Sequence, residues 1–400
     1  MQVSVTSKKS NLLIFLIIGT AWLFDAMDVA LLSYIMPLIH THWQLTDTQT
    51  GLASSISSIG MIAGGFLFGR LADQIGRSKT LIWSLLIFSI GNGLLAISPN
   101  FTVFLIIRFF VGMGLGGELP VAATYIADLY SQEQRSKMLI LADSFWAVGW
   151  LVAAALSFFL SPLLGWRGLL FLTAFTAFFA LILREHIKDL DDKTTTKKST
   201  SKIALSQMLT WQTPLLWIAW FMVMFSYYGM FMWLPSILAA RGNNVVEGFG
   251  YSIIIVVAQL PGYFLAAWLS SKIQVRYVFA IYMLGTAIGA IWFGQVQGQI
   301  ATILAGCVLS FFNLGAYGAI IALTPQLYPS SIRGTMTGLA QGIGRIGAVV
   351  GPLLVGVLMD ASIAIQTIFV IFMLSLLVGA LCILAISEKK PQPQMEKKHE

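Results

Sequence analysis

Four charged residues interrupt long apolar stretches of this sequence: Asp25, Asp28, Arg108 and Arg345. A charged side chain facing lipid at the centre of a membrane helix costs about 2.5 to 3.5 kcal/mol. Because Asp25 and Asp28 are three residues apart, they lie on one face of a helix. That face must point into the protein. Charges kept at this cost are expected to bind a proton, an ion or a charged substrate.

Asp28 and Arg108 are expected to lie at a similar depth, because their helices run in opposite directions. An ion pair between them is the prediction. A carboxylate whose arginine partner moves away in a dry interior binds a proton more readily, so the pair suits proton coupling; a structural salt bridge is the alternative. Asp25 and Glu118 are further candidates for proton coupling, with Glu118 also a candidate gate residue. Asp143, near the inner end of its helix, is expected at the membrane interface.

Arg345 is expected near the bilayer midplane, since it lies eleven residues from the inner end of its apolar stretch. A guanidinium at this depth needs an anion. A substrate carboxylate would fit, because guanidinium and carboxylate pair through two parallel hydrogen bonds. A structural pair with Asp25 or Glu118 is the alternative.

Aromatic residues crowd the middle of several apolar stretches, where most are expected to serve packing. Some have polar neighbours and could hold a flat ring by stacking and hydrogen bonding. The candidates for substrate binding beside Arg345 are Trp146, Tyr227, Tyr228, Gln259, Phe312, Asn313 and Tyr317.

The elements that position these residues are predicted to be membrane helices. Of the 400 residues, 57% are hydrophobic and 10% charged, which excludes an ordinary soluble protein. A helix of about 20 residues spans a bilayer core. Twelve stretches qualify, at 11–39, 50–72, 80–98, 101–129, 137–163, 166–184, 213–240, 248–270, 276–296, 299–327, 334–360 and 363–387.

The chain divides into two predicted bundles of six helices, 11–184 and 211–387. Between them lies 185–210, a polar segment rich in Lys, Asp, Thr and Ser that is typical of a flexible cytoplasmic linker. The remaining segments, 1–10 and 388–400, are predicted cytoplasmic tails, because Lys and Arg concentrate on that side. The net charge of +7 therefore reflects mainly the orientation of the chain in the membrane, and nucleic-acid binding has little support.

An internal repeat supports the division into two bundles. The segment 127–130 (ADLY) with Arg135 matches 325–328 (PQLY) with Arg333 at a shift of 198 residues. Duplication of a unit with an even number of helices produces two copies of parallel topology. A substrate site is then expected at their interface, near mid-membrane.

The loop after the second apolar stretch, 69–79, reads GRLADQIGRSK. It resembles the signature loop of the major facilitator superfamily. The resemblance implies an all-α membrane fold of twelve helices, transport by alternating access, and a monomer. It also implies a cytoplasmic latch of charged residues, to which we assign Asp73 and Arg77 with the repeat-related Arg135 and Arg333.

A closer resemblance lies in six segments of the sequence: 21–37, 112–122, 143–151, 225–236, 258–264 and 309–318. They resemble the bacterial niacin transporters of this superfamily, which implies import of nicotinate across the inner (plasma) membrane. Proton symport is the hypothesis for energy coupling, because carrying a proton removes the cost of importing an anion against an inside-negative potential; a facilitator without proton coupling is the alternative. The paired Asp25 and Asp28 also resemble a motif of aromatic acid and proton symporters, so benzoate-like substrates remain an alternative.

Other classes of protein have less support from the sequence. It contains no HExxH motif and no Ser-His-Asp arrangement, and its two cysteines lie in apolar stretches without a metal-ligand spacing. The segment 112–117 (GMGLGG) formally matches a dinucleotide fingerprint, but no strand precedes it, so its glycines predict close helix packing instead. We therefore expect neither an enzyme nor a bound metal or cofactor. A non-transporting receptor would need a sizeable cytoplasmic domain, which the sequence does not contain.

Overall fold

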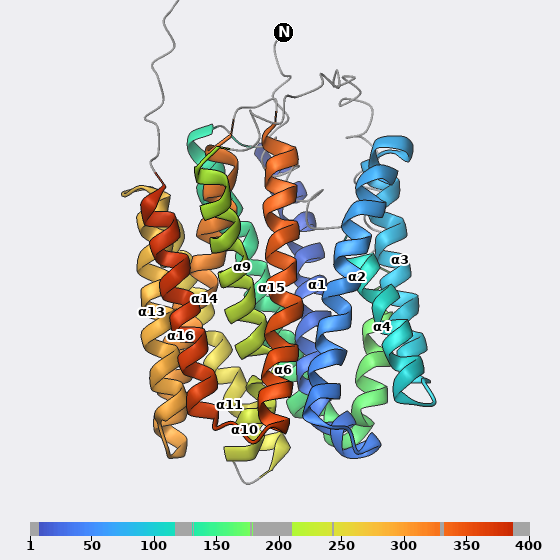
Figure 1. Ribbon diagram of the computed structural model, residues 1–400. Coiled ribbons are helices and arrows are strands. Elements are labelled where there is room, and N and C mark those ends of the chain that lie inside the picture. The colour runs from blue at the N-terminus through green and yellow to red at the C-terminus, as the bar shows by residue number, and fades with distance from the viewer. Residues whose placement is uncertain are drawn as a thin grey trace, which may run out of the picture.

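The computed structural model describes residues 8–116, 130, 132–176, 178, 210–241, 244–328 and 332–386. Within these ranges the regular secondary structure is helical, and the long helices run side by side as a bundle (Figure 1). The helices are α1 (Lys8–Trp43), α2 (Asp47–Ile75), α3 (Arg77–Ala96), α4 (Phe101–Gly116), α6 (Gln132–Ala174), α9 (Gln212–Phe231), α10 (Leu234–Arg241), α11 (Val245–Val257), α12 (Gln259–Leu269), α13 (Val275–Gln295), α14 (Gln299–Leu323), the 3₁₀ turn η1 (Thr324–Gln326), α15 (Arg333–Asp360) and α16 (Ile365–Ala385).

The described helices have the length and apolar character of membrane spans. Nine helical segments in the described ranges are long and apolar enough to cross a bilayer, and two shorter apolar helices, 82–96 and 101–116, accompany them. The predicted all-α membrane class is therefore confirmed. One of the nine segments, in α6, runs through Gly165, whose φ of 62° interrupts the helix between the fifth and sixth predicted spans.

Two spans predicted as single helices are broken in the structure. The span 213–240 consists of α9 and α10, and the span 248–270 consists of α11 and α12. Each break has a proline four residues after the last residue of the first helix, Pro235 after α9 and Pro261 after α11. A proline ring clashes with the carbonyl four residues before it, which accounts for both positions.

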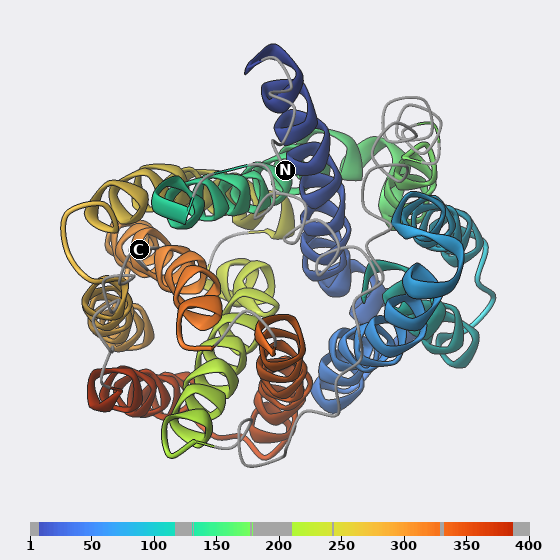
Figure 2. The same ribbon diagram turned by 90° about the horizontal axis from the view of Figure 1, so that it is seen from above.

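Two seams join the first half of the molecule (α1 to α6) to the second half (α9 to α16). In one seam α15 packs along α2, and in the other α6 packs against α11, α12 and α14. Figure 2 shows both seams from the end of the bundle at which α1 begins and α16 ends. We call this the terminal end, and the end that carries the α1–α2 and α15–α16 connections the opposite end (Figure 1).

The α2–α15 seam is tight towards the opposite end. A β-carbon added to Gly51 would lie 2.5 Å from the carbonyl oxygen of Pro352, so the two backbones approach more closely than a side chain allows. The Ser55 hydroxyl donates to the carbonyl of Val349 at 2.6 Å. Towards the terminal end, by contrast, β-carbons added to Gly338 and Gly342 of α15 would meet nothing within 4 Å. The two helices therefore touch at one end and leave α15 open at the other.

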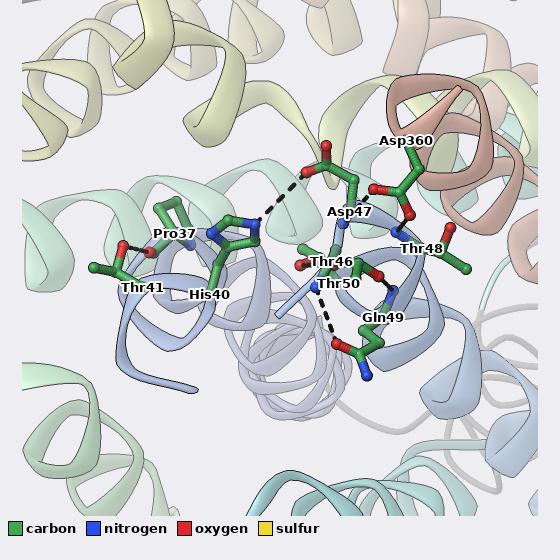
Figure 3. A network of polar contacts seen from close by, with 9 residues as sticks. All are labelled: Pro37, His40, Thr41, Thr46, Asp47, Thr48, Gln49, Thr50 and Asp360. Carbon is green, nitrogen blue, oxygen red and sulfur yellow. Dashed lines mark hydrogen bonds and ion pairs between the residues drawn. The ribbon is translucent and has the colours of Figure 1, made fainter. Parts of the chain in front are cut away.

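A carboxylate from the second half caps the first turn of α2 at the opposite end of the seam (Figure 3). Asp360 accepts hydrogen bonds from the backbone N–H groups of Asp47, at 3.0 Å, and Thr48, at 2.9 Å. The side chain of Thr46 also caps this helix, and His40 Nε2 lies 3.8 Å from Asp47 Oδ1. Because the N-terminus of a helix carries partial positive charge, the Asp360 carboxylate stabilises contact between the halves here.

Candidate functional site

The first half contains the predicted ion pair, buried between α1 and α4. The Arg108 Nη1 atom lies 3.3 Å from Asp28 Oδ2, and each side chain is only 1% exposed. Arg108 Nη2 also donates to the backbone carbonyl of Asp28 at 3.3 Å. The two residues are therefore held together at both the side chain and the backbone. Their role in proton coupling stays a prediction.

A third residue, Asn92 of α3, completes this cluster. Its side chain is fully buried. Its Nδ2 group donates to Asp28 Oδ1, and its Oδ1 accepts from Arg108 Nη1 at 3.3 Å. Asn92 was not among the predicted site residues, although an amide inside an apolar helix is itself a signal of a polar contact. We refer to Asp28, Asn92 and Arg108 as the first-half cluster.

Close packing of α2 on α4 helps to place Arg108. A β-carbon on Gly112 would clash with the carbonyl of Ser57, and one on Gly60 would clash with that of Phe109. The glycines of this part of α4 thus serve helix packing, as the sequence predicts.

Arg345 lies in the α2–α15 seam, where it contacts both halves. Its Nη1 group donates to the Tyr228 hydroxyl, at 3.2 Å, and to the Met61 sulfur, at 2.8 Å. Arg345 is 9% exposed. It also interacts electrostatically with Tyr317 and Asp25. The structure thus provides a basis for both hypotheses about Arg345, a site for a substrate carboxylate and a structural partner of Asp25, which is itself buried.

Four of the predicted ring-binding residues meet beside Arg345. Trp146 Nε1 of α6 donates to the Tyr227 hydroxyl of α9 at 2.7 Å, which joins the two halves. The rings of Tyr227 and Tyr317 are stacked, with centroids 6.3 Å apart. Tyr228, which holds Arg345, packs edge-on against Tyr227 at 5.1 Å. We call Trp146, Tyr227, Tyr228 and Tyr317 the aromatic cluster.

Two predicted polar residues are buried with unused hydrogen-bonding capacity, and one predicted aromatic residue lies elsewhere. Gln259 and Asn313 are at most 1% exposed, and their amide atoms have no partner among the residues that the structure describes. Such groups are available to a ligand.

Phe312, however, packs against Tyr282 and Gly285 of α13. The structure therefore places Phe312 between helices of the second half and away from the aromatic cluster.

Asp143 is buried where α6 meets the second half of the molecule. Its side chain is 1% exposed, and its Oδ2 atom accepts a hydrogen bond of 2.9 Å from the Tyr263 hydroxyl of α12. The sequence did not predict this burial, which arises because α12 and α14 pack against α6. One signal could have revealed it. Asp143 is three residues before Trp146, so it shares the face of α6 that meets the second half.

The side chains of five predicted site residues are not described by the structure. Glu118 falls in the segment 117–129. For the latch, only the helix positions are described, and the side chains of Asp73, Arg77, Arg135 and Arg333 are not. The gate and latch roles of these residues stay predictions.

Comparison with known proteins identifies the family. Residues 18–260 and 248–400 match the family model described as "Major Facilitator Superfamily". This chain belongs to the major facilitator superfamily. It is a multi-pass membrane transporter rather than an enzyme.

Two relatives within the superfamily match over nearly their whole length. The chain is 45% identical to a "putative niacin/nicotinamide transporter NiaP" of Bacillus subtilis, covering 94% of this chain and 96% of that protein. It is 34% identical to a "niacin transporter NiaP" of Acinetobacter baylyi, covering 95% and 94%.

Solved structures show the same fold at lower sequence identity. The proton:xylose symporter XylE superposes with a TM-score of 0.79 at 17% identity, covering 95% of this chain and 96% of that one. A bacterial homologue of the human lysosomal transporter Spinster, in an inward-facing and occupied conformation, superposes with a TM-score of 0.75 at 16% identity, covering 95% and 97%.

Proposed function

We propose that this transporter imports nicotinate together with at least one proton. The observation that carries the proposal is the position of Arg345, a buried guanidinium in the seam between the halves, beside the aromatic cluster. Nicotinate combines a carboxylate with a flat pyridine ring. The guanidinium suits the carboxylate, the tyrosine and tryptophan rings suit the pyridine face, and the amides of Gln259 and Asn313 suit the ring nitrogen. Two niacin transporters among the relatives support this choice of substrate.

Proton coupling follows from the charge of the substrate. Nicotinate is an anion at neutral pH, and importing one negative charge against an inside-negative potential costs about 2.3 kcal/mol per 100 mV. A proton carried in the same step removes that cost. Asp28 is the proposed proton carrier, because it is a buried carboxylate whose partners, Arg108 and Asn92, belong to other helices.

Alternating access would move the two bundles, 11–184 and 211–387, about the central site. In this proposal the terminal end faces the cytoplasm of a bacterial cell, with both termini inside, and the protein lies in the inner (plasma) membrane as a monomer. Asp73, Arg77, Arg135 and Arg333 would form the cytoplasmic latch. Asp25 and Glu118 would take part in proton transfer.

A second candidate substrate class is the benzoate-like acids, favoured by the pair Asp25 and Asp28. Benzoate has the carboxylate and the flat ring but lacks the ring nitrogen. Nicotinamide has the ring nitrogen but lacks the carboxylate. Competition by these two compounds therefore tests the two ends of the site separately.

Uptake of labelled nicotinate into proteoliposomes tests the proposal. We expect nicotinate to accumulate inside the vesicles when the outside is acid. Without a pH gradient, the internal concentration should rise only until it equals the external one. Excess benzoate and nicotinamide should each compete less well than nicotinate. Accumulation that ignores the pH gradient would contradict symport, and equal competition by benzoate would identify an aromatic acid transporter.

The Asp28→Asn variant tests the proton carrier in the same vesicles. An amide cannot take up the proton, so gradient-driven accumulation should be lost while exchange of internal for external nicotinate continues. Unchanged accumulation would exclude Asp28 as the carrier.

A further inference from the structure

Asp143 is a buried carboxylate to which the proposed function assigns no task. The partner that accompanies it in the described structure is the neutral hydroxyl of Tyr263. Burying a carboxylate is costly unless a cation or several hydrogen bonds compensate for it. Because a single hydroxyl compensates only in part, a neutral hydrophobic residue would serve packing at this position at less cost. The carboxylate therefore calls for a functional explanation.

The location of the bond distinguishes Asp143 from Asp28. The described side-chain partners of Asp28 are Asn92 and Arg108, which belong to the same half of the molecule. The bond from Tyr263 to Asp143 instead crosses the seam from α12 to α6. A ligand shifts a conformational equilibrium only through interactions that differ between the two conformations. A proton on Asp143 meets this condition directly, because it alters a contact between the moving parts.

The surroundings of Asp143 connect it to the aromatic cluster. The titratable groups that interact with it are tyrosine hydroxyls on the helices facing α6: Tyr227 and Tyr228 on α9, Tyr263 on α12 and Tyr317 on α14. Tyr228 and Tyr317 also interact with Arg345. A β-carbon added to Gly318 would lie 3.5 Å from Asp143 Oδ2, so α14 approaches the carboxylate closely. The carboxylate thus lies where proton binding and substrate binding can affect one another.

We propose that Asp143 is a second proton-binding residue of the transport cycle, and that its protonation loosens the contact between α6 and α12. This proposal rests on proton symport, the proposed function. An ionised carboxylate accepts a stronger hydrogen bond than a protonated one, roughly twice as strong. The bond from Tyr263 therefore stabilises the closed seam while Asp143 is ionised, and weakens when the proton arrives.

The position of the bond along the helices gives the direction of the effect. Asp143 is eleven residues from the start of α6, and Tyr263 is six residues from the end of α12, so the bond lies towards the terminal end. Proton binding favours opening of that end, which is the proposed cytoplasmic side. Release of the proton there restores the ionised carboxylate and the bond, and the seam closes again. This sequence of steps returns the empty carrier for the next cycle of import.

The first test follows proton movement with a pH-sensitive dye outside proteoliposomes after nicotinate is added. Wild type should take up protons with the substrate, whereas Asp143→Asn should take up fewer protons for each nicotinate, because Asp28 remains but the introduced amide, which still accepts the bond from Tyr263, cannot bind the second proton. The matched control is Ser144→Ala, which changes the next residue on α6 and should leave proton uptake intact. Proton uptake by Asp143→Asn as in wild type would overturn the inference. A wild type that moves no protons would instead overturn the proposed function.

The second test reads the conformation, so it also covers an Asp143→Asn variant that no longer transports. Spin labels at Gln134 and Lys272, both exposed, report the separation of α6 and α12 after replacement of Cys307 and Cys382 by alanine. Lower pH should increase the population of longer distances in the parent protein. Asp143→Asn should abolish that dependence. Distances that respond to pH in both proteins, or in neither, would overturn the inference.

Discussion

The two buried arginines of this transporter have contrasting surroundings. Arg108 lies within the first half, beside Asp28 and Asn92. Arg345 lies between the halves, where its guanidinium donates to the hydroxyl of Tyr228 and the sulfur of Met61. A guanidinium within ion-pair distance of a carboxylate suits internal coupling, whereas one whose hydrogen bonds are to neutral groups at a seam, with Asp25 as an electrostatic neighbour, is better suited to an anionic ligand. The difference teaches that the neighbours of a buried arginine determine which task it suits.

Replacing Arg108 should have the largest effect on stability. Arg108→Ala leaves the buried Asp28 without its cation, and breaking a buried pair in this way costs about 3 to 5 kcal/mol. Denaturant unfolding in detergent measures the loss. Arg345→Ala should lose less stability than Arg108→Ala, because the guanidinium of Arg345 donates its hydrogen bonds to neutral groups, the Tyr228 hydroxyl and the Met61 sulfur. Equal losses for the two variants would remove the contrast between the arginines.

Replacing Arg345 should have the larger effect on binding. We expect Arg345→Ala to weaken nicotinate binding by about 1.5 to 3 kcal/mol, roughly 10- to 150-fold, as for a hydrogen bond to a charged group. Neutral nicotinamide should be affected far less. Calorimetric titration of both compounds checks this. Equal weakening of both would indicate that Arg345 is a structural partner of Asp25.

Asn92→Leu tests the third member of the first-half cluster. Losing its hydrogen bonds to charged groups should cost about 1 to 3 kcal/mol of stability. Gradient-driven accumulation of nicotinate should also fall, since the amide holds Asp28 and Arg108 in place. Ser89→Ala is a matched control, because Ser89 is equally buried on α3 but bonds Thr176 instead. Unchanged accumulation would limit Asn92 to packing.

The smallest expected effect concerns the cap on α2. Asp360→Ala removes the acceptor for two backbone N–H groups and should favour separation of the seam at the opposite end. A cysteine in place of buried Ser55, which bonds Val349 across that seam, should then react several-fold faster with an impermeant maleimide. Asp360→Asn, which keeps one acceptor, should fall between wild type and Asp360→Ala. Equal rates in all three would show that the cap does not control the seam.

Much of the fold could be predicted, because each membrane helix can be recognised from the apolar character of its own segment. The length of each apolar stretch marks a span, although the span 213–240 was predicted as one helix and the structure breaks it before Pro235 into α9 and α10. Depth along a helix also predicted the pair of Asp28 and Arg108. The depth of a residue along its helix does not show which neighbouring helix its side chain contacts. The partners contributed by other helices, Asn92 for Asp28 and Tyr263 for Asp143, were therefore missed.

The sequence by itself determined the membrane class, the spans, the family resemblance and the set of buried charges, because each depends on residue type and spacing along the chain. The tertiary structure decided which partners each charged residue contacts and in which half of the molecule those partners lie. It joined Asp28 to its neighbours within one half, placed Arg345 and Asp143 at seams between halves, and moved Phe312 out of the proposed site. The physical reason is that a helix fixes the height and face of each side chain, whereas lateral packing of helices distant in the chain fixes its partner.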